Sequence, residues 1–174
     1  MIDEWKVDDV LPAQDLDDLA AVLHAAVHAG ASVSFVLPFS LEDARAFWHK
    51  KVLQGVRDRT RIVLVARSEG EIVGTVQLLL DTPPNQKHRA EVAKLLVHPK
   101  LRRRGLARAL MEEIERVARR EGRTLITLDT RTGDFAEPLY RSMGYVLAGI
   151  IPRYACDPEG RNLEPTSILF KELA

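Results

Sequence analysis

The sequence contains little that could cross-link the chain or hold it in a membrane. It has 174 residues and one cysteine, Cys156, which cannot close an internal disulfide and argues against a structural zinc cluster. No run approaches the roughly 18 uninterrupted apolar residues of a membrane-spanning helix. The 25 basic and 25 acidic side chains cancel, so net charge predicts no nucleic-acid or membrane partner. The fold must therefore be held together by packing.

Composition and charge distribution set the expected class of protein. With 46% hydrophobic and 29% charged residues, the chain resembles an average soluble domain, and no linker or repeat divides it. We expect one domain over residues 1–174. The first twenty residues carry seven acids and one lysine, the opposite of a secretory leader. Together with the unpaired cysteine, this predicts a cytoplasmic protein.

The N-terminal third predicts a short strand followed by two helices. A strand is expected around residues 5–7, and Asp15 is positioned to cap a helix whose apolar residues recur at helical spacing up to Gly30. Ser40, with Asp43 three residues later, has the pattern of a second helix start. Two helices are thus expected before the first long strand.

The middle of the chain predicts a hairpin and then a strand–helix–strand unit. Residues 61–68 and 71–80 are typical of antiparallel strands joined by a tight turn. Residues 89–99 predict a strand, 105–121 a helix and 124–130 another strand, so the two outer strands of this unit should be parallel neighbours. On the helix we expect two outward i,i+4 ion pairs: Glu112 with Arg116, and Glu115 with Arg119.

The last forty residues predict a short helix and two more strands. The helix is expected over residues 136–143, and the strands over 145–151 and 166–173, with a type I turn at 157–160 between them. The whole pattern predicts an α/β (α+β) fold with a mixed sheet that contains a parallel βαβ unit.

The sharpest chemical signal is the junction of the third long strand with the longest helix. Residues 100–108 hold five basic residues and no acid, and the run Arg102, Arg103, Arg104, Gly105, Leu106, Ala107 opens the helix. A first helical turn presents unpaired N–H groups and a partial positive charge, which suits a pyrophosphate. Three or four such hydrogen bonds, at about 1.5–3 kcal/mol each before desolvation, are enough for micromolar binding.

Two motifs in register resemble a known family. Arg102-x-x-Gly105-x-Ala107 after a strand, followed by the run from Ala136 to Tyr145 (AEPLYRSMGY), is similar to the two hallmarks of the GNAT N-acetyltransferase superfamily. The resemblance implies a twisted, mostly antiparallel mixed sheet flanked by helices. The segments 28–35 (HAGASVSF), 89–97 and 151–171 further resemble tabtoxin-resistance acetyltransferases.

The resemblance implies a cofactor, acetyl-CoA, and roles for particular residues. The backbone of residues 102–107 would bind the pyrophosphate, and the main chain of Leu95, Leu96 and Val97 would pair with the pantetheine arm. Tyr140 would protonate the departing thiolate, because a phenol of pKa about 10 stays protonated at neutral pH beside a thiol of about 8.5. Many relatives have asparagine where this chain has Gly133, so that side-chain contact is absent.

Two carboxylates are candidates for the base that deprotonates the acceptor amine. Glu91 lies six residues before Val97, a spacing that predicts a shared strand face with Leu95 and Val97, and Asp129 ends the neighbouring strand. Apolar flanks predict that burial raises the pKa of both. Asp129 could instead hold the ammonium group, and the choice between them stays open.

Each of these residues also has a plain structural interpretation. The arginine run could be a solvated surface, Tyr140 a core aromatic, and Glu91 half of a cross-strand ion pair. His24 and His28 are spaced i,i+4, but no third ligand is evident, so we expect no metal site. Cys156 is expected to be a packing residue.

The leading functional hypothesis is transfer of an acetyl group from acetyl-CoA to a primary amine of a small molecule. Acceptor specificity is expected in residues 30–40, 81–88 and 152–166, with Ser32, Ser34 and Tyr154 as polar contacts. The alternatives are a protein N-terminus or lysine as acceptor, a CoA sensor without turnover, and a nucleic-acid-binding module. Zero net charge and the lack of aromatics in residues 86–123 speak against the last. We expect a monomer or homodimer.

Overall fold

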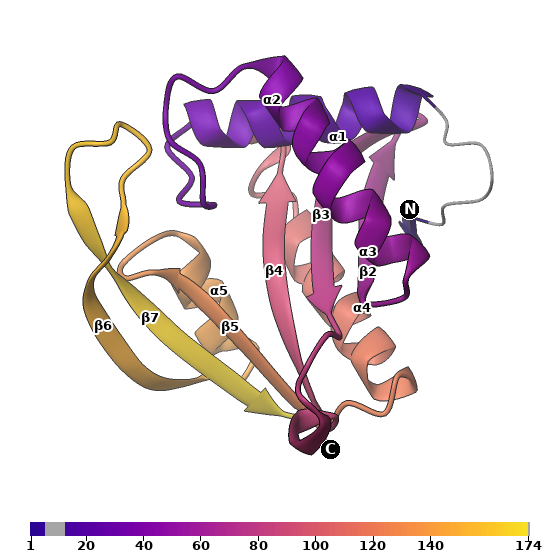
Figure 1. The fold of residues 1–174 in the computed structure, drawn as a ribbon, viewed down its shortest axis with the longest axis vertical. Coiled ribbons are helices and arrows are strands. Elements are labelled where there is room, and N and C mark those ends of the chain that lie inside the picture. The colour runs from indigo at the N-terminus through magenta and orange to yellow at the C-terminus, as the bar shows by residue number, and fades with distance from the viewer. Residues whose placement is uncertain (6–12, 174) are drawn as a thin grey trace.

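A mixed sheet of seven strands organises the part of the chain that the structure describes. The computed structural model describes residues 1–5 and 13–173. The strand order is β1-β2-β3-β4-β5-β7-β6 (Figure 1). The strands are β1 (Ile2–Glu4), β2 (Arg61–Ser68), β3 (Glu71–Leu79), β4 (Arg89–Val97), β5 (Leu125–Arg131), β6 (Val146–Cys156) and β7 (Leu163–Glu172). All neighbours are antiparallel except β4 and β5, so the predicted mixed fold and parallel unit are confirmed.

Helices cover both faces of the sheet. They are α1 (Ala13–His28), α2 (Leu41–Ala46), the π-helical turn η1 (Phe47–Val52), α3 (Leu53–Arg57), the 3₁₀ turns η2 (Pro84–Gln86) and η3 (Pro99–Leu101), α4 (Leu106–Arg120) and α5 (Ala136–Ser142). The α1 to α3 segment lies on one face and α4 on the other (Figure 1). None of the helices in residues 13–173 has both the length and the apolar character needed to cross a membrane.

The two faces of the sheet form two cores because strand residues alternate between them. On β2, Val63 and Val65 pack with α1, whereas Ile62 and Leu64 pack with α4. We call these the α1 core and the α4 core, after the helix that covers each face. Trp48 is fully buried in the α1 core and makes an edge-on contact with Trp5, with their ring centroids 6.4 Å apart. Because both sheet faces are covered, consecutive residues of β2 and β3 are buried rather than every second one.

The start of the second helix is as predicted, but the start of the first is not. Ser40 accepts a hydrogen bond from the Asp43 backbone N–H at 3.0 Å, which completes a capping box. Asp15 lies inside α1 rather than at its cap, and its carboxylate accepts hydrogen bonds from Arg67 at 2.8 and 2.9 Å. The buried carboxylate is better satisfied by this guanidinium than by free helix N–H groups. Residues 6 and 7 of the expected first strand lie outside the described residues.

One of the two ion pairs expected on the surface of α4 is buried instead. Glu115 is 5% exposed and accepts from the Lys171 ammonium on β7 at 2.7 and 2.8 Å. Arg116 pairs with Glu113 rather than with Glu112. The expectation of outward pairs was wrong because the buried stripe of α4 is wide enough to include Glu115, which a lysine from the sheet then compensates.

Candidate active site

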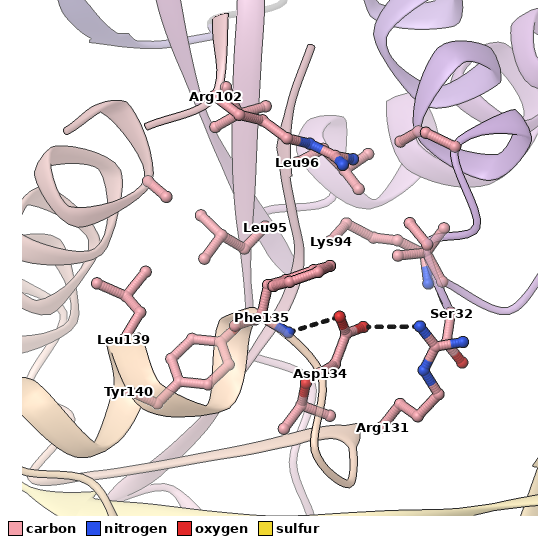
Figure 2. Close-up of a pocket in the computed structure, with 18 of the residues that line it drawn as sticks. Ser32, Lys94, Leu95, Leu96, Arg102, Arg131, Asp134, Phe135, Leu139 and Tyr140 are labelled. Atoms are coloured by element: carbon pink, nitrogen blue, oxygen red, sulfur yellow. Dashed lines mark hydrogen bonds and ion pairs between the residues drawn. The ribbon is translucent and has the colours of Figure 1, made fainter. Parts of the chain in front are cut away.

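The parallel strands β4 and β5 separate after a short paired stretch. Their paired positions run from Arg89 opposite Leu125 to Glu91 opposite Thr127, and within the described residues no later pair joins them. β4 nevertheless continues to Val97, so the β5-facing edge of its second half has no neighbouring strand. A cavity of about 710 Å³ opens between the two strands (Figure 2). Unpaired main-chain groups at a cavity wall can bind an extended ligand as a further strand would.

One end of this cavity is the start of α4. Gly105 precedes the helix at φ +81°, a left-handed conformation that favours glycine, and no side chain caps the first turn. A Cβ added to Gly105 would meet nothing within 4 Å, so the space before the helix is open. Arg102, Arg103, Leu106 and Ala107 also line the cavity, whereas Arg104 does not. Free helix N–H groups beside guanidinium groups fit a pyrophosphate.

A bulge at Lys94 changes which residues share a face of β4. Lys94 has φ +52°, and the register with β3 shifts between Thr75 and Gln77. Before the bulge Ala90 and Val92 belong to the α4 core, and after it Leu95 and Val97 pack there while Leu96 joins the α1 core. Glu91 therefore does not share a face with Leu95 and Val97. The expectation from even spacing was wrong because the bulge adds one residue to the strand.

The two candidate bases lie in different surroundings. Glu91 is half-buried, and burial, followed by the negative charge of Asp129, raises its pKa above its ordinary value. Its side chain does not line the cavity, whereas Asp129 does. Asp129 is exposed, contrary to the expected burial, because β5 has already left β4 at that position.

Tyr140 reaches the cavity from α5. It is 6% exposed, and its ring packs edge-on against Tyr145 with centroids 5.8 Å apart. Burial first, and then the charges of Asp129 and Asp134, raise the pKa of Tyr140 well above its ordinary value. The phenol is thus held protonated in the cavity wall, the state that a general acid requires.

The predicted acceptor contacts divide into two that line the cavity and one that does not. Ser32 and Ser34 line it from the connection between α1 and α2. Tyr154 does not: it lies on the edge strand β6 and is 52% exposed. The expectation placed it in the site because it falls in the segment 152–166 between two predicted strands, but β6 extends to Cys156 and most of its side chains are exposed.

The described residues contain no group of three or more His, Cys, Asp or Glu side chains that could hold a metal ion. The rings of His24 and His28 stack with centroids 4.0 Å apart, and His28 Nδ1 lies 3.0 Å from the His24 carbonyl oxygen. This pair is therefore accounted for by packing on α1.

The cavity geometry agrees with the sequence family that the chain matches. The family model described as "Acetyltransferase (GNAT) family" matches residues 23–145, which include the start of α4, the open edge of β4 and Tyr140. The chain belongs to the GNAT acetyltransferase family. It is accordingly an acetyl-CoA-dependent acyltransferase.

Sequence relatives support the same assignment, and solved structures of other proteins share the fold of this GNAT enzyme. An uncharacterised N-acetyltransferase from the hisH-hisA intergenic region of Azospirillum brasilense is 35% identical over 132 residues, 75% of this chain and 76% of that protein. Human N-acetyltransferase 8 is 38% identical over 87 residues, 49% of this chain and 38% of that protein.

Two solved structures share the fold. Ribosomal-protein-alanine N-acetyltransferase from Brucella melitensis has a TM-score of 0.78 at 24% identity over 99% of both chains. The acetyltransferase yncA from Salmonella typhimurium, solved with its cofactor acetyl-CoA, has a TM-score of 0.75 at 19% identity, and the match covers 99% of this chain and 94% of that chain.

Several cavity residues of the GNAT enzyme were not predicted from its sequence, and four of them are polar or aromatic side chains near Asp129 and Tyr140 in the chain or in the cavity. Lys94, Arg131, Asp134 and Phe135 all line the cavity, and Arg131 forms an ion pair with Asp134 at 3.5 Å (Figure 2). Phe135 is 86% exposed. A lysine flanked by apolar residues in β4 was the one available signal, since burial of an unpaired ammonium is costly. The others follow the end of β5, where the sequence gives no periodic pattern.

Replacing Glu91 with glutamine is expected to change how thermal stability depends on pH. A carboxyl whose pKa is raised by folding binds more protons in the folded state, so its contribution to stability is present below the unfolded pKa of about 4.3 and is lost as pH rises. The melting temperature of Glu91→Gln minus that of the parent protein should therefore increase from pH 4 to pH 7. A thermal shift series at constant ionic strength measures this. A difference that stays constant over that range would contradict the burial argument.

Proposed function

We propose that this GNAT acetyltransferase acetylates a primary amine of a small molecule by direct attack in a ternary complex. One observation carries the proposal: a single cavity joins the uncapped start of α4 to Asp129 and Tyr140. Residues 29–34 line the same cavity from the α1 side, which limits the acceptor that can enter. The accessible region suits a compact amine better than a protein chain.

The chain supplies the binding and alignment of the donor. Acetyl-CoA, when bound, supplies the thioester whose acetyl group is transferred. The backbone of residues 102–107 binds the pyrophosphate, and the open main-chain edge of Leu95, Leu96 and Val97 aligns the pantetheine arm. An N–H of this edge stabilises negative charge at the thioester carbonyl.

Proton transfer falls to three side chains. An alkylammonium of pKa about 10.4 must lose its proton before attack, a cost of about 4–5 kcal/mol at pH 7. Asp129, in the cavity, receives the ammonium, and Glu91, with its raised pKa, is the candidate to accept the proton through Asp129 or water. As the C–N bond forms and the C–S bond breaks, Tyr140 gives its proton to the leaving sulfur.

Finer assignments rest on sequence resemblance and composition. Segments 28–35, 89–97 and 151–171 support a tabtoxin-resistance type of enzyme, and with it a role in detoxification or resistance and an amino-acid-like toxin, an antibiotic or a polyamine-like acceptor. The acidic start and lone cysteine support a cytoplasmic location. We propose residues 1–174 as one domain, acting as a monomer or homodimer without nucleic-acid or membrane partners.

Turnover with a mixed panel of acceptors tests the function. We expect thiol release from acetyl-CoA, and a 42-dalton gain on the acceptor for an acetyl group, with small amines but not with peptides bearing free N-termini or lysines. Calorimetry with CoA should show saturable binding in the micromolar range. Faster reaction with peptides would show that the acceptor is a protein N-terminus or lysine. CoA binding without turnover on any amine would indicate a CoA sensor.

A further inference from the structure

Lys94 is a cavity residue for which the transfer reaction as described has no use. Its bulged, left-handed backbone turns the side chain toward the α1–α2 connection, where Nζ donates to Ser34 Oγ at 3.0 Å. The ammonium also lies over the Phe35 ring, 5.8 Å from its centroid. Non-glycine residues at positive φ cost energy and tend to persist where a site depends on them.

The charges at this end of the cavity are incompletely paired. Arg131 and Asp134 form an ion pair, and Asp134 also accepts from the Phe135 backbone N–H at 2.6 Å. Across the described ranges, 1–5 and 13–173, neither Lys94 nor Asp129 belongs to an ion pair, although both line the cavity. Apart from the arginines at the start of α4, this leaves one cation and one carboxylate, and Asp129 is the strongest charge acting on Lys94.

The ammonium of Lys94 has one hydrogen-bond partner among the described residues, the Ser34 hydroxyl. Burial lowers the pKa of Lys94, and Asp129 and Glu91 only partly oppose this effect. The Ser34 hydroxyl satisfies one of its three N–H donors. An anion entering the cavity would accept hydrogen bonds from the other two N–H donors and would stabilise the charged form of Lys94.

We propose that the acceptor is a zwitterion, an amine that also carries a carboxylate, and that Lys94 with Ser34 binds this carboxylate while Asp129 holds the ammonium. The inference rests on the proposed acetyl transfer and narrows its substrate class. It excludes polyamine-like acceptors, because a second ammonium would face Lys94. Among the acceptor classes open to the enzyme, amino acids and amino-acid-like toxins fit both charges.

Matched acceptors test the proposal. Each standard amino acid is compared with its carboxamide and with the amine that lacks the carboxyl group, and spermidine is added as a polycation. We expect the parent enzyme to favour at least one amino acid over its carboxamide by about 10- to 100-fold in kcat/KM. Lys94→Met should abolish this preference, Lys94→Arg should retain part of it, and Ser34→Ala should weaken it.

Amino acids and their carboxamides differ in the pKa of the amine. The ratio of their kcat/KM values is therefore compared between the parent enzyme and each variant, because this difference is the same for every enzyme. Lys51→Met, at an exposed lysine outside the cavity, is the matched control and should keep the parent ratio. Carboxamides or spermidine reacting as well as amino acids in the parent enzyme would overturn the zwitterion proposal and leave acetyl transfer standing. So would an unchanged ratio in folded Lys94→Met. Absence of thiol release with every amine would instead overturn the proposed function and this inference with it.

Discussion

Replacing Tyr140 with phenylalanine is expected to lower kcat about 100- to 1,000-fold, within the range that a positioned general acid contributes. The ring is buried against Tyr145, so phenylalanine keeps the packing and removes only the hydroxyl. Affinity for CoA should change little, because the start of α4 and the edge of β4 are untouched. Steady-state kinetics with the best acceptor, together with calorimetry on CoA, separates the two effects.

Tyr145→Phe is the matched control for this variant. Tyr145 is equally buried, but it does not line the cavity, so its loss of a hydroxyl should leave kcat within about threefold. An unchanged rate in Tyr140→Phe would show that Tyr140 is not the general acid and that it serves only as a core aromatic residue. A thiol with a lower pKa as leaving group should partly rescue the variant, because such a thiolate needs less protonation.

The largest effect on stability is expected at Lys171. Replacing it with methionine leaves the Glu115 carboxylate buried without its cation, which should cost about 3 kcal/mol and lower the melting temperature by about 6–12 °C. Lys171 also lies over the Tyr145 ring, 5.5 Å from its centroid, and Tyr145 packs on Tyr140. Urea unfolding and thermal melts measure the loss.

Two further variants show whether the loss comes from the buried pair. Arg116→Met breaks the exposed pair with Glu113 on the same helix and should cost less than about 0.5 kcal/mol. The double variant Glu115→Leu with Lys171→Met should recover most of the stability, because both charges are then replaced by apolar groups. A loss below about 1 kcal/mol in Lys171→Met would mean that water reaches Glu115.

The sequence predicted the order of elements, and it singled out the start of α4 that lines one end of the cavity, because those features are local. Helical spacing, the glycine before α4 and the β-branched run of β5 each act over a few residues, and they sufficed for the parallel unit and the arginine loop. The capping box at Ser40 was equally predictable, since all its partners lie within four residues.

The features that were missed depend on distant partners. The bulge at Lys94 is defined only by its register against β3, so counting along β4 placed Glu91 on the wrong face. The charge of the buried Glu115 is compensated by Lys171, which lies 56 positions later on β7. Tyr154 was placed by its position in the segment 152–166, whereas the direction of its side chain depends on how β6 pairs with β7.

The separation of β4 from β5 also bears on how the protein avoids self-association. A bare strand edge normally recruits strands from other molecules and seeds aggregates. Here that edge lies in the wall of the cavity, which β5 and residues 29–34 also line. This edge of β4 is therefore less accessible to a strand of another molecule than the edges at the two ends of the sheet, β1 and β6.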